Sequence, residues 1–218
     1  MTVRHHISDE ILMSYAAGSL TEGWSLLVAT HLALCPRCRT RTRSAEAVGG
    51  WLLESLEETP ISPGLLEKLM ARIECEPSPP PRAAAFASHG PVRLPDPLRS
   101  YVGGDLDKLK WRRLGTQAYQ IAIKTADPET RVQLMRFPSG MVVPRHGHGG
   151  AELTLVLSGS LCDGGEVFER GDVQEADENV EHTPVAGPVE GCICLAVTDA
   201  PLRFRSLLIR LVQPFLRI

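Results

Sequence analysis

A proline-rich segment near the middle of the chain divides the sequence into two parts with different residue patterns. Seven of the 22 residues from Glu76 to Pro97 are proline, and three consecutive alanines lie among them. Segments of this composition are extended and semi-rigid, and they link folded units instead of packing into them. The sequence of 218 residues therefore predicts two small domains, at 1–75 and 98–218, joined by a linker over 76–97.

The 75 residues before the linker are predicted to form helices. Four stretches have the apolar spacing of a helix. A residue that commonly caps or begins a helix stands at the start of each stretch. These starting positions are Ser8, Thr21, Pro36 and Ser62. The Gly49-Gly50 pair lies inside the third helix and can bend or break it, because each glycine costs roughly 1 kcal/mol relative to alanine.

The residues after the linker are predicted to form an all-β domain. Residues 131–137 alternate between polar and apolar side chains, while residues 153–157 and 192–197 are mainly apolar. Glycine and proline separate these runs at short intervals, which is typical of a compact sandwich or barrel. The predicted fold class is therefore multi-domain, with an all-α domain followed by an all-β domain.

The spacing H-x3-C-x2-C in the helical part indicates a metal site. His31 and Cys35 lie one helical turn apart, and Cys38 follows almost one turn later. Two thiolates and an imidazole suit tetrahedral zinc, and one more ligand would complete the site. His6, just before the first helix, is our preferred fourth ligand, and His5 is the alternative.

We expect the zinc at this site to be structural. A domain of 75 residues buries little surface, and a structural zinc contributes an apparent ~10–16 kcal/mol of binding energy. The alternative is that the histidine and the cysteines are ordinary core residues, which is the better explanation for any one of them alone. Their shared spacing favours zinc.

A second metal site is predicted in the all-β part. The segment from Gly140 to Gly159 fits G-x5-H-x-H-x3-E-x6-G. His146 and His148 share a face of a strand, because alternate residues point the same way. Glu152 lies an even number of residues later, after a glycine turn where the chain can fold back, and His182 follows on a later strand. Three imidazoles and one carboxylate suit zinc, iron, manganese or nickel, and they leave room for water or a small ligand.

Cys192 and Cys194 are candidates for redox sensing. They lie two residues apart in an apolar run, so both side chains should face the same side of a strand. A Cα separation of roughly 6.6–6.8 Å, expected from the strand rise, is near the upper limit for a disulfide. A reactive thiol pair near the metal is one hypothesis, and two ordinary buried cysteines are the alternative.

Charge and hydropathy argue against two classes of partner. The net charge is -3, and residues 1–75 hold seven Lys and Arg against nine Asp and Glu, so direct nucleic-acid binding is not expected. No stretch reaches the ~18 apolar residues needed to span a bilayer, so no membrane partner is expected either. Because residues 1–19 lack a secretion signal and the six cysteines should be reduced, a cytoplasmic location is predicted.

Four segments of the sequence resemble those of ChrR-type zinc anti-sigma factors. They are Arg4-His5-His6, the run from Ala29 to Cys38, Cys192-Ile193-Cys194-Leu195, and the ending Arg210-Leu211-Val212-Gln213-Pro214-Phe215. The likeness covers nearly the whole chain and is weakest in the linker. It implies a helical anti-sigma domain followed by a cupin barrel. The implied zinc ligands are His6, His31, Cys35 and Cys38 in the first domain, and His146, His148, Glu152 and His182 in the second.

The resemblance also implies a function. Members of the family bind an extracytoplasmic-function sigma factor and block its access to core RNA polymerase. They release it under oxidative stress, typically from singlet oxygen or organic hydroperoxides, and the cupin domain is needed for that response. The chain is therefore expected to be a transcriptional regulator and not an enzyme. Oxidation near Cys192 and Cys194, or loss of metal at His182, is the change that we expect to trigger release.

The same residues are compatible with two other functions. A metal-dependent cupin enzyme, such as a dioxygenase or isomerase, would use the open metal position, with the helical part as a docking arm. This chain has Asp177 and Asn179 where the general cupin pattern expects proline and glycine, which weakens the analogy with cupin enzymes. A zinc-dependent DNA-binding regulator would use the arginines after the cysteines, but the acidic balance of residues 1–75 argues against it. Those arginines are Arg37, Arg39, Arg41 and Arg43.

Overall fold

The computed structural model describes residues 2–76 and 93–204. Most of the predicted linker, and the ending at 210–215 that contributes to the family resemblance, lie outside the described residues. The domain limits at 1–75, 76–97 and 98–218 therefore stay a prediction. Within the described part of the chain, no helix is both long enough and apolar enough to cross a membrane.

The four helices predicted before the linker are present. They are α1 (Asp9–Ala16), α2 (Glu22–Leu34), α3 (Pro36–Glu54) and α4 (Leu65–Cys75). The Gly49-Gly50 pair does not interrupt α3, which runs through it without a break. The fourth helix begins three residues after Ser62, because Gly64 adopts a left-handed conformation (φ 75°) and forms its N-cap.

A fifth helix precedes the strands, and here the sequence prediction of strand-like structure after Leu98 was wrong. Helix α5 spans Asp96–Val102, with a proline in its first turn and Gly103 in the left-handed conformation at its end. Proline near the start and glycine after the end are the usual helix limits, so a local signal was present. The prolines were assigned to the linker, and the signal was missed.

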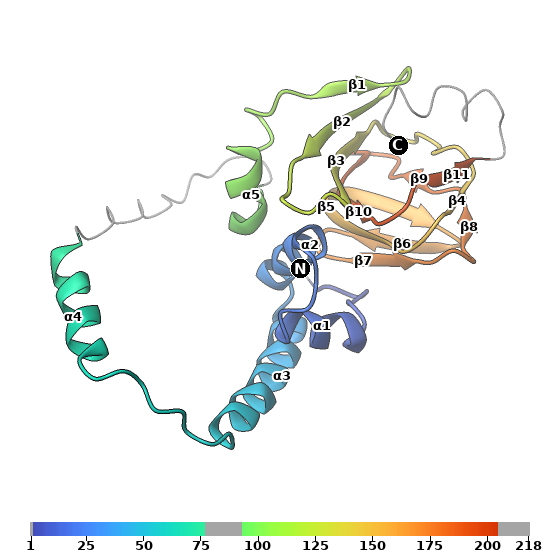
Figure 1. Cartoon of the computed structure of the whole chain (residues 1–218). Coiled ribbons are helices and arrows are strands. Elements are labelled where there is room, and N and C mark those ends of the chain that lie inside the picture. The colour runs from blue at the N-terminus through green and yellow to red at the C-terminus, as the bar shows by residue number, and fades with distance from the viewer. Residues whose placement is uncertain (1, 77–92, 205–218) are drawn as a thin grey trace.

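Eleven strands follow in the described residues. They are β1 (Arg112–Leu114), β2 (Ala118–Ile123), β3 (Arg131–Phe137), β4 (His146–His148), β5 (Glu152–Asp163), β6 (Glu166–Glu169), β7 (Val173–Ala176), β8 (Glu181–His182), β9 (Val185–Ala186), β10 (Cys192–Thr198) and β11 (Leu202–Phe204). The larger sheet has the order β1-β2-β3-β10-β5-β6, with β7 and β9 also paired to β5. A smaller sheet has the order β11-β4-β8. An N-terminal helical region followed by a β-rich domain is the predicted fold class, which the structure confirms (Figure 1).

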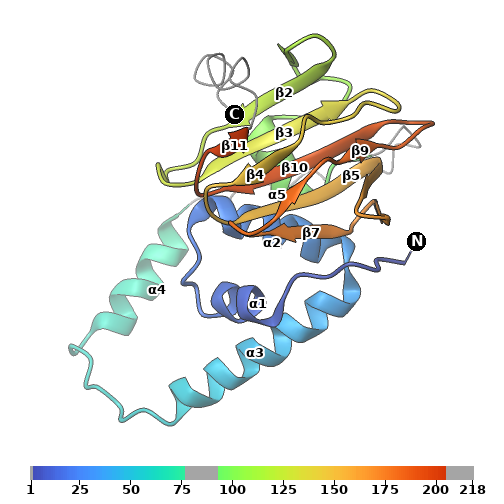
Figure 2. The same ribbon diagram turned by 90° about the vertical axis from the view of Figure 1, so that its right-hand side faces the viewer.

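The helical region and the larger sheet share one hydrophobic core. Leu27 and Val28 of α2 belong to the same buried cluster as Leu153 and Leu155 of β5, and Figure 2 shows α2 lying against the sheet. Close packing explains the glycine at position 23, because a Cβ atom there would lie 2.8 Å from Val132 Cγ2 and would also clash with Thr130. The two parts of the chain are therefore packed together over a continuous apolar surface.

The end of α3 and all of α4 stand away from this core. We call residues 48–75 the helical arm, which projects away from the sheets in both views (Figures 1 and 2). No residue of α4 is buried. The arm nevertheless carries large exposed apolar side chains, namely Val48, Trp51, Leu52, Leu53, Leu56, Ile61, Leu65, Leu66, Leu69, Met70 and Ile73.

Candidate metal centres

The first cluster forms where the segment before α1 meets the junction of α2 and α3. His31 lies in the last turn of α2, Cys35 separates the two helices, and Cys38 lies in the first turn of α3. His6 comes from the extended segment before α1, and its Nδ1 is 3.3 Å from Cys35 Sγ and 3.6 Å from Cys38 Sγ. One donor atom from each of the four residues lies within 4.8 Å of the others. The structure thus brings together the four residues that the sequence analysis named.

The turn between α2 and α3 brings the two thiols together. Cys35 has an extended backbone (φ -110°, ψ 103°) and is the N-cap of α3, where its Sγ accepts a hydrogen bond from the backbone N–H of Cys38 at 3.4 Å. Pro36 occupies the first turn, where its missing N–H costs no helical hydrogen bond. The spacing C-x2-C therefore places both sulfur atoms on the same side of the helix start.

His5 points away from this cluster. Its ring packs against Phe168 with a centroid distance of 4.3 Å, and its Nδ1 lies 3.4 Å from Asp172 Oδ2. Adjacent residues of an extended segment point in opposite directions, so only one of the two histidines can reach the thiols. In this structure that residue is His6.

The chemistry of the four donors fits a divalent metal. His31 Nε2 is buried and has no hydrogen-bond partner among the described residues. A buried polar atom of this kind is unfavourable unless something binds it. Burial lowers the pKa of His31 to about 4, and burial together with Cys35 raises the pKa of Cys38 to about 11. A bound cation would replace the thiol protons, and two sulfur and two nitrogen ligands are a common structural zinc set.

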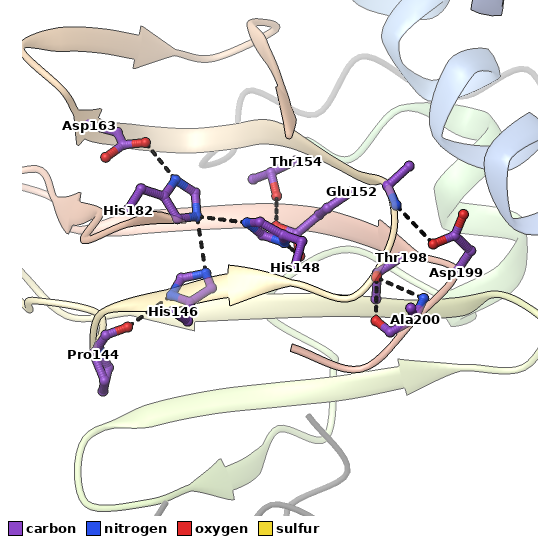
Figure 3. Close-up of polar contacts among 11 residues, drawn as sticks. Pro144, His146, His148, Glu152, Thr154, Asp163, His182, Thr198, Asp199 and Ala200 are labelled. Atoms are coloured by element: carbon purple, nitrogen blue, oxygen red, sulfur yellow. Dashed lines mark hydrogen bonds and ion pairs between the residues drawn. The ribbon is translucent and has the colours of Figure 1, made fainter. Parts of the chain in front are cut away.

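The second cluster is carried by two neighbouring strands of the smaller sheet, β4 and β8. His146 and His148 are the two buried ends of β4, and His182 of β8 pairs directly with His146. His182 Nε2 is 3.1 Å from the Nε2 atoms of both other imidazoles (Figure 3). Three of the four predicted donors therefore lie close together.

Hydrogen bonds fix the orientation of two of these imidazoles. His146 Nδ1–H donates to the carbonyl of Pro144 at 2.8 Å, and His182 Nδ1–H donates to Asp163 Oδ2 at 2.6 Å (Figure 3). Gln174 Nε2–H donates to the same carboxylate oxygen at 2.6 Å. Partners of this kind set the tautomer and leave Nε2 available to a metal. Asp163 and Gln174 are not predicted from the sequence, because nothing in the local pattern relates them to His182.

Glu152 lies beside the histidines but is not part of the group of converging donors. Its Oε2 is 3.5 Å from His148 Nδ1, and its Oε1 accepts a hydrogen bond from Thr154 Oγ1 at 3.0 Å (Figure 3). Burial opposes ionisation of this carboxyl group, but His148, His146 and Thr154 outweigh it and hold its pKa below the usual value. Glu152 as the fourth metal ligand therefore stays a prediction.

A small cavity adjoins the second cluster. Its volume is about 90 Å³, and its lining includes His146, His182, Glu152 and Cys194. Pockets for drug-sized ligands usually measure about 300–1,000 Å³. The cavity therefore suits water or a very small molecule better than a typical enzyme substrate.

Of the two buried cysteines of β10, Cys194 lines this cavity. Cys192 and Cys194 are nearly inaccessible and both are free thiols, while Ile193 between them is partly exposed. Hydrogen bonding to Cys192 and burial raise the pKa of Cys194 well above its usual value. The thiolate, which is the reactive form, is thus disfavoured at neutral pH. A redox role for the pair stays a prediction.

Comparison with known proteins defines the class to which this fold and these clusters belong. Residues 100–201 match the family described as the ChrR cupin-like domain. The anti-sigma-E factor ChrR of Cereibacter sphaeroides is 48% identical over 218 residues, covering 100% of both chains. The crystal structure of Rhodobacter sphaeroides SigE in complex with the anti-sigma ChrR contains a chain that is 42% identical, with a TM-score of 0.77, and the match covers 91% of this chain and 100% of that chain.

The β-rich part is therefore a cupin-like domain that follows a helical anti-sigma region. The chain belongs to the ChrR family of anti-sigma factors, which confirms the resemblance found in the sequence. Proteins of this class are regulators of transcription and not enzymes.

Proposed function

We propose that this chain binds an extracytoplasmic-function sigma factor through its helical region and releases it in response to oxidative stress. One relative of known structure, an anti-sigma ChrR, was crystallised in complex with the sigma factor SigE. The observation on this chain that carries the proposal is the helical arm, whose large apolar side chains are exposed in the described part of the chain. Because that partner acts with RNA polymerase, the proposed function requires a cytoplasmic location.

The arm has the pattern of a helix that binds in a groove. In α4, Leu66, Leu69, Met70 and Ile73 follow the spacing of one helical face, and all are exposed. Large apolar side chains that gather on one exposed helical face usually mark a protein interaction site. A sigma factor that buries this face would be covered by the arm and kept from core RNA polymerase.

The first metal cluster would hold the helices in the arrangement that binding requires. Its donors come from the segment before α1 and from both sides of the α2–α3 turn. A structural zinc there would contribute an apparent ~10–16 kcal/mol and fix the direction in which α3 leaves the core. The residues that would hold it are His6, His31, Cys35 and Cys38.

The cupin-like domain would be the sensor. Its three histidines would hold zinc or another first-row divalent metal, with Glu152 as the proposed fourth ligand. Release would follow oxidation near Cys192 and Cys194 or loss of metal at His182. Cys194 and His182 line the same small cavity, so a small oxidant that entered it would meet both. A signal can shift binding only if it changes the relative stability of two states.

The decisive experiment measures binding and inhibition with a purified sigma factor of the SigE type from the same organism. We expect a stoichiometric complex that blocks transcription by core RNA polymerase in vitro. A variant with Leu66→Ser, Leu69→Ser and Ile73→Ser should lose binding while circular dichroism shows an intact fold. A matched variant with Val167→Ser on the exposed face of β6 should bind normally. Absence of binding by the native chain, or normal binding by the arm variant, would contradict the proposal.

Two further measurements test the metals and the sensor. Removing metal from the first cluster with a chelator should abolish sigma binding, and added zinc should restore it. A Cys192→Ser/Cys194→Ser variant should hold its partner after exposure to an organic hydroperoxide, whereas the native chain releases it. Normal release by that variant would exclude the thiols and leave the histidine cluster as the proposed sensor.

A further inference from the structure

The segment before α1 runs along strand β7 of the cupin-like domain. The backbone N–H groups of Arg4 and His5 donate to Asp172 Oδ1 at 2.6 and 2.9 Å. The carbonyl of His5 accepts from the backbone N–H of Val173 at 3.2 Å. The N–H of Ser8 donates to Glu175 Oε1 at 2.8 Å. His6 lies inside this stretch, so its backbone is fixed by contacts with the cupin-like domain.

The same turn of the cupin-like domain also contacts a second member of the first metal cluster. The carbonyl of Gly171 accepts a hydrogen bond from His31 Nδ1–H at 2.9 Å. This bond selects the tautomer in which Nε2 is unprotonated and directed at the thiols. Two of the four predicted ligands are therefore held by residues 171 and 172, which lie about 140 residues or more away in the sequence.

Gly171 and Asp172 are both suited to this contact. Gly171 has φ 94°, and a Cβ atom there would lie 2.8 Å from Val3 Cγ2, so only glycine allows the segment to approach. Asp172 is 1% exposed. Its Oδ2 accepts from the backbone N–H of Glu169 at 2.9 Å. One carboxylate therefore joins its own turn to the N-terminal segment.

We propose that the Gly171-Asp172 turn is part of the first metal site, with Asp172 as a positioning residue. The turn would fix the tautomer of His31 through the Gly171 carbonyl, and the backbone that carries His6 through the Asp172 carboxylate. The inference rests on the proposal that this cluster binds a divalent metal. It makes the cupin-like domain a structural component of a site whose ligands all come from the helical region.

Strand β7 also connects this turn to the second cluster. Gln174, two residues after Asp172, donates to the Asp163 carboxylate that orients His182. The Gly171-Asp172 turn, which contacts the first cluster, and Gln174, which contacts the partner of His182, therefore lie next to each other at the start of β7. A movement of the start of β7 would therefore change the support of a predicted metal ligand in each cluster.

The test uses cobalt(II) as a probe in the full chain. Cobalt bound to the two thiolates gives a sulfur-to-metal charge-transfer band that a histidine cluster cannot give, so the band reports the first site alone. An Asp172→Ala variant should bind cobalt at this site about 10–100-fold more weakly, the range found when partners of metal ligands are removed. The control is Asp177→Ala, because Asp177 caps the backbone N–H of Asn179 in another turn of the same domain. This control should bind cobalt as the native chain does.

A second variant and a second measurement separate positioning from loss of fold. Asp172→Asn keeps the shape and one acceptor oxygen, so we expect partial recovery of affinity. Because Asp172 also holds its own turn through the Glu169 N–H, its loss should free the Gly171 carbonyl from its position. Nitrogen-15 NMR of the metal-free histidines should then show the Nδ1–H tautomer of His31 in the native chain and a mixture in Asp172→Ala. Native cobalt affinity in a folded Asp172→Ala variant would overturn this inference alone. Absence of the sulfur band in the native chain would overturn the proposed metal site and this inference together.

Discussion

Trp51 offers a direct test of the helical arm as a sigma-binding surface. It lies in the second half of α3, and 66% of its surface is exposed. An aromatic side chain can bury about 150–250 Å² in an interface. Two thirds of the upper value, about 165 Å², is the exposed area of Trp51 that a partner could cover. At about 25 cal/mol per Å², this area corresponds to about 4 kcal/mol. Association does not convert the whole of this area into affinity. We therefore expect Trp51→Ala to cost about 2–4 kcal/mol of binding free energy, or about 30- to 1,000-fold in Kd.

Isothermal titration calorimetry with the purified sigma factor measures this change. Because Trp51 is largely exposed, its removal should leave the thermal unfolding midpoint of the isolated chain nearly unchanged. Tyr119→Ala provides the control, since Tyr119 is also a partly exposed aromatic residue but lies on strand β2. A Trp51→Ala variant that binds with native affinity would show that the partner does not cover this part of the arm. A large fall in stability would instead mean that Trp51 packs within the chain.

Three further predictions address the cupin-like domain and its contact with the helices. Asp163→Asn should weaken metal binding at the histidine cluster about 10–100-fold, because His182 loses an anionic partner, while the cobalt–sulfur band of the first site is unchanged. Gly23→Val should destabilise the fold by about 1–3 kcal/mol in urea titrations, because α2 would be pushed off the sheet, whereas Gly49→Ala at an open position should not. The pKa of Cys194 is raised in the folded state, so its neutral thiol stabilises the fold. This stabilisation is complete below pH 9 and is lost as the pH rises above 9, because the thiol ionises more easily in the unfolded chain. Unfolding at pH 8 and pH 10 should therefore differ more for the native chain than for Cys194→Ala.

The features that the sequence predicted correctly depend on local geometry. Helix starts follow from residues such as Thr21 and Pro36, whose conformational preferences are independent of the rest of the fold. The convergence of His146 with His148 follows from strand alternation, and that of Cys35 with Cys38 from a single turn.

The features that the sequence could not predict depend on distant pairings. Asp172 meets Arg4 and His5 across 168 and 167 residues, and no repeat or spacing relates these positions. The choice between His5 and His6 as the fourth predicted metal ligand also depends on a distant pairing. Only the pairing of the first segment with β7 decides that His5 packs on Phe168 while His6 faces the thiols. Helix α5 was missed for a different reason, because its proline resembles those of the preceding linker.

The continuous core between α2 and the larger sheet limits how a signal can pass through the molecule. If the two parts moved apart as rigid bodies, Leu27, Val28, Leu153 and Leu155 would all meet water. Each such side chain would lose about 1.5–3 kcal/mol of transfer free energy, so full separation would approach the cost of unfolding a small domain. A slight sliding or rotation of α2 on β5 and β10 would keep that surface dry and would still change the direction of α3 at the cysteine turn, so the proposed sensing would have to use a movement of this size.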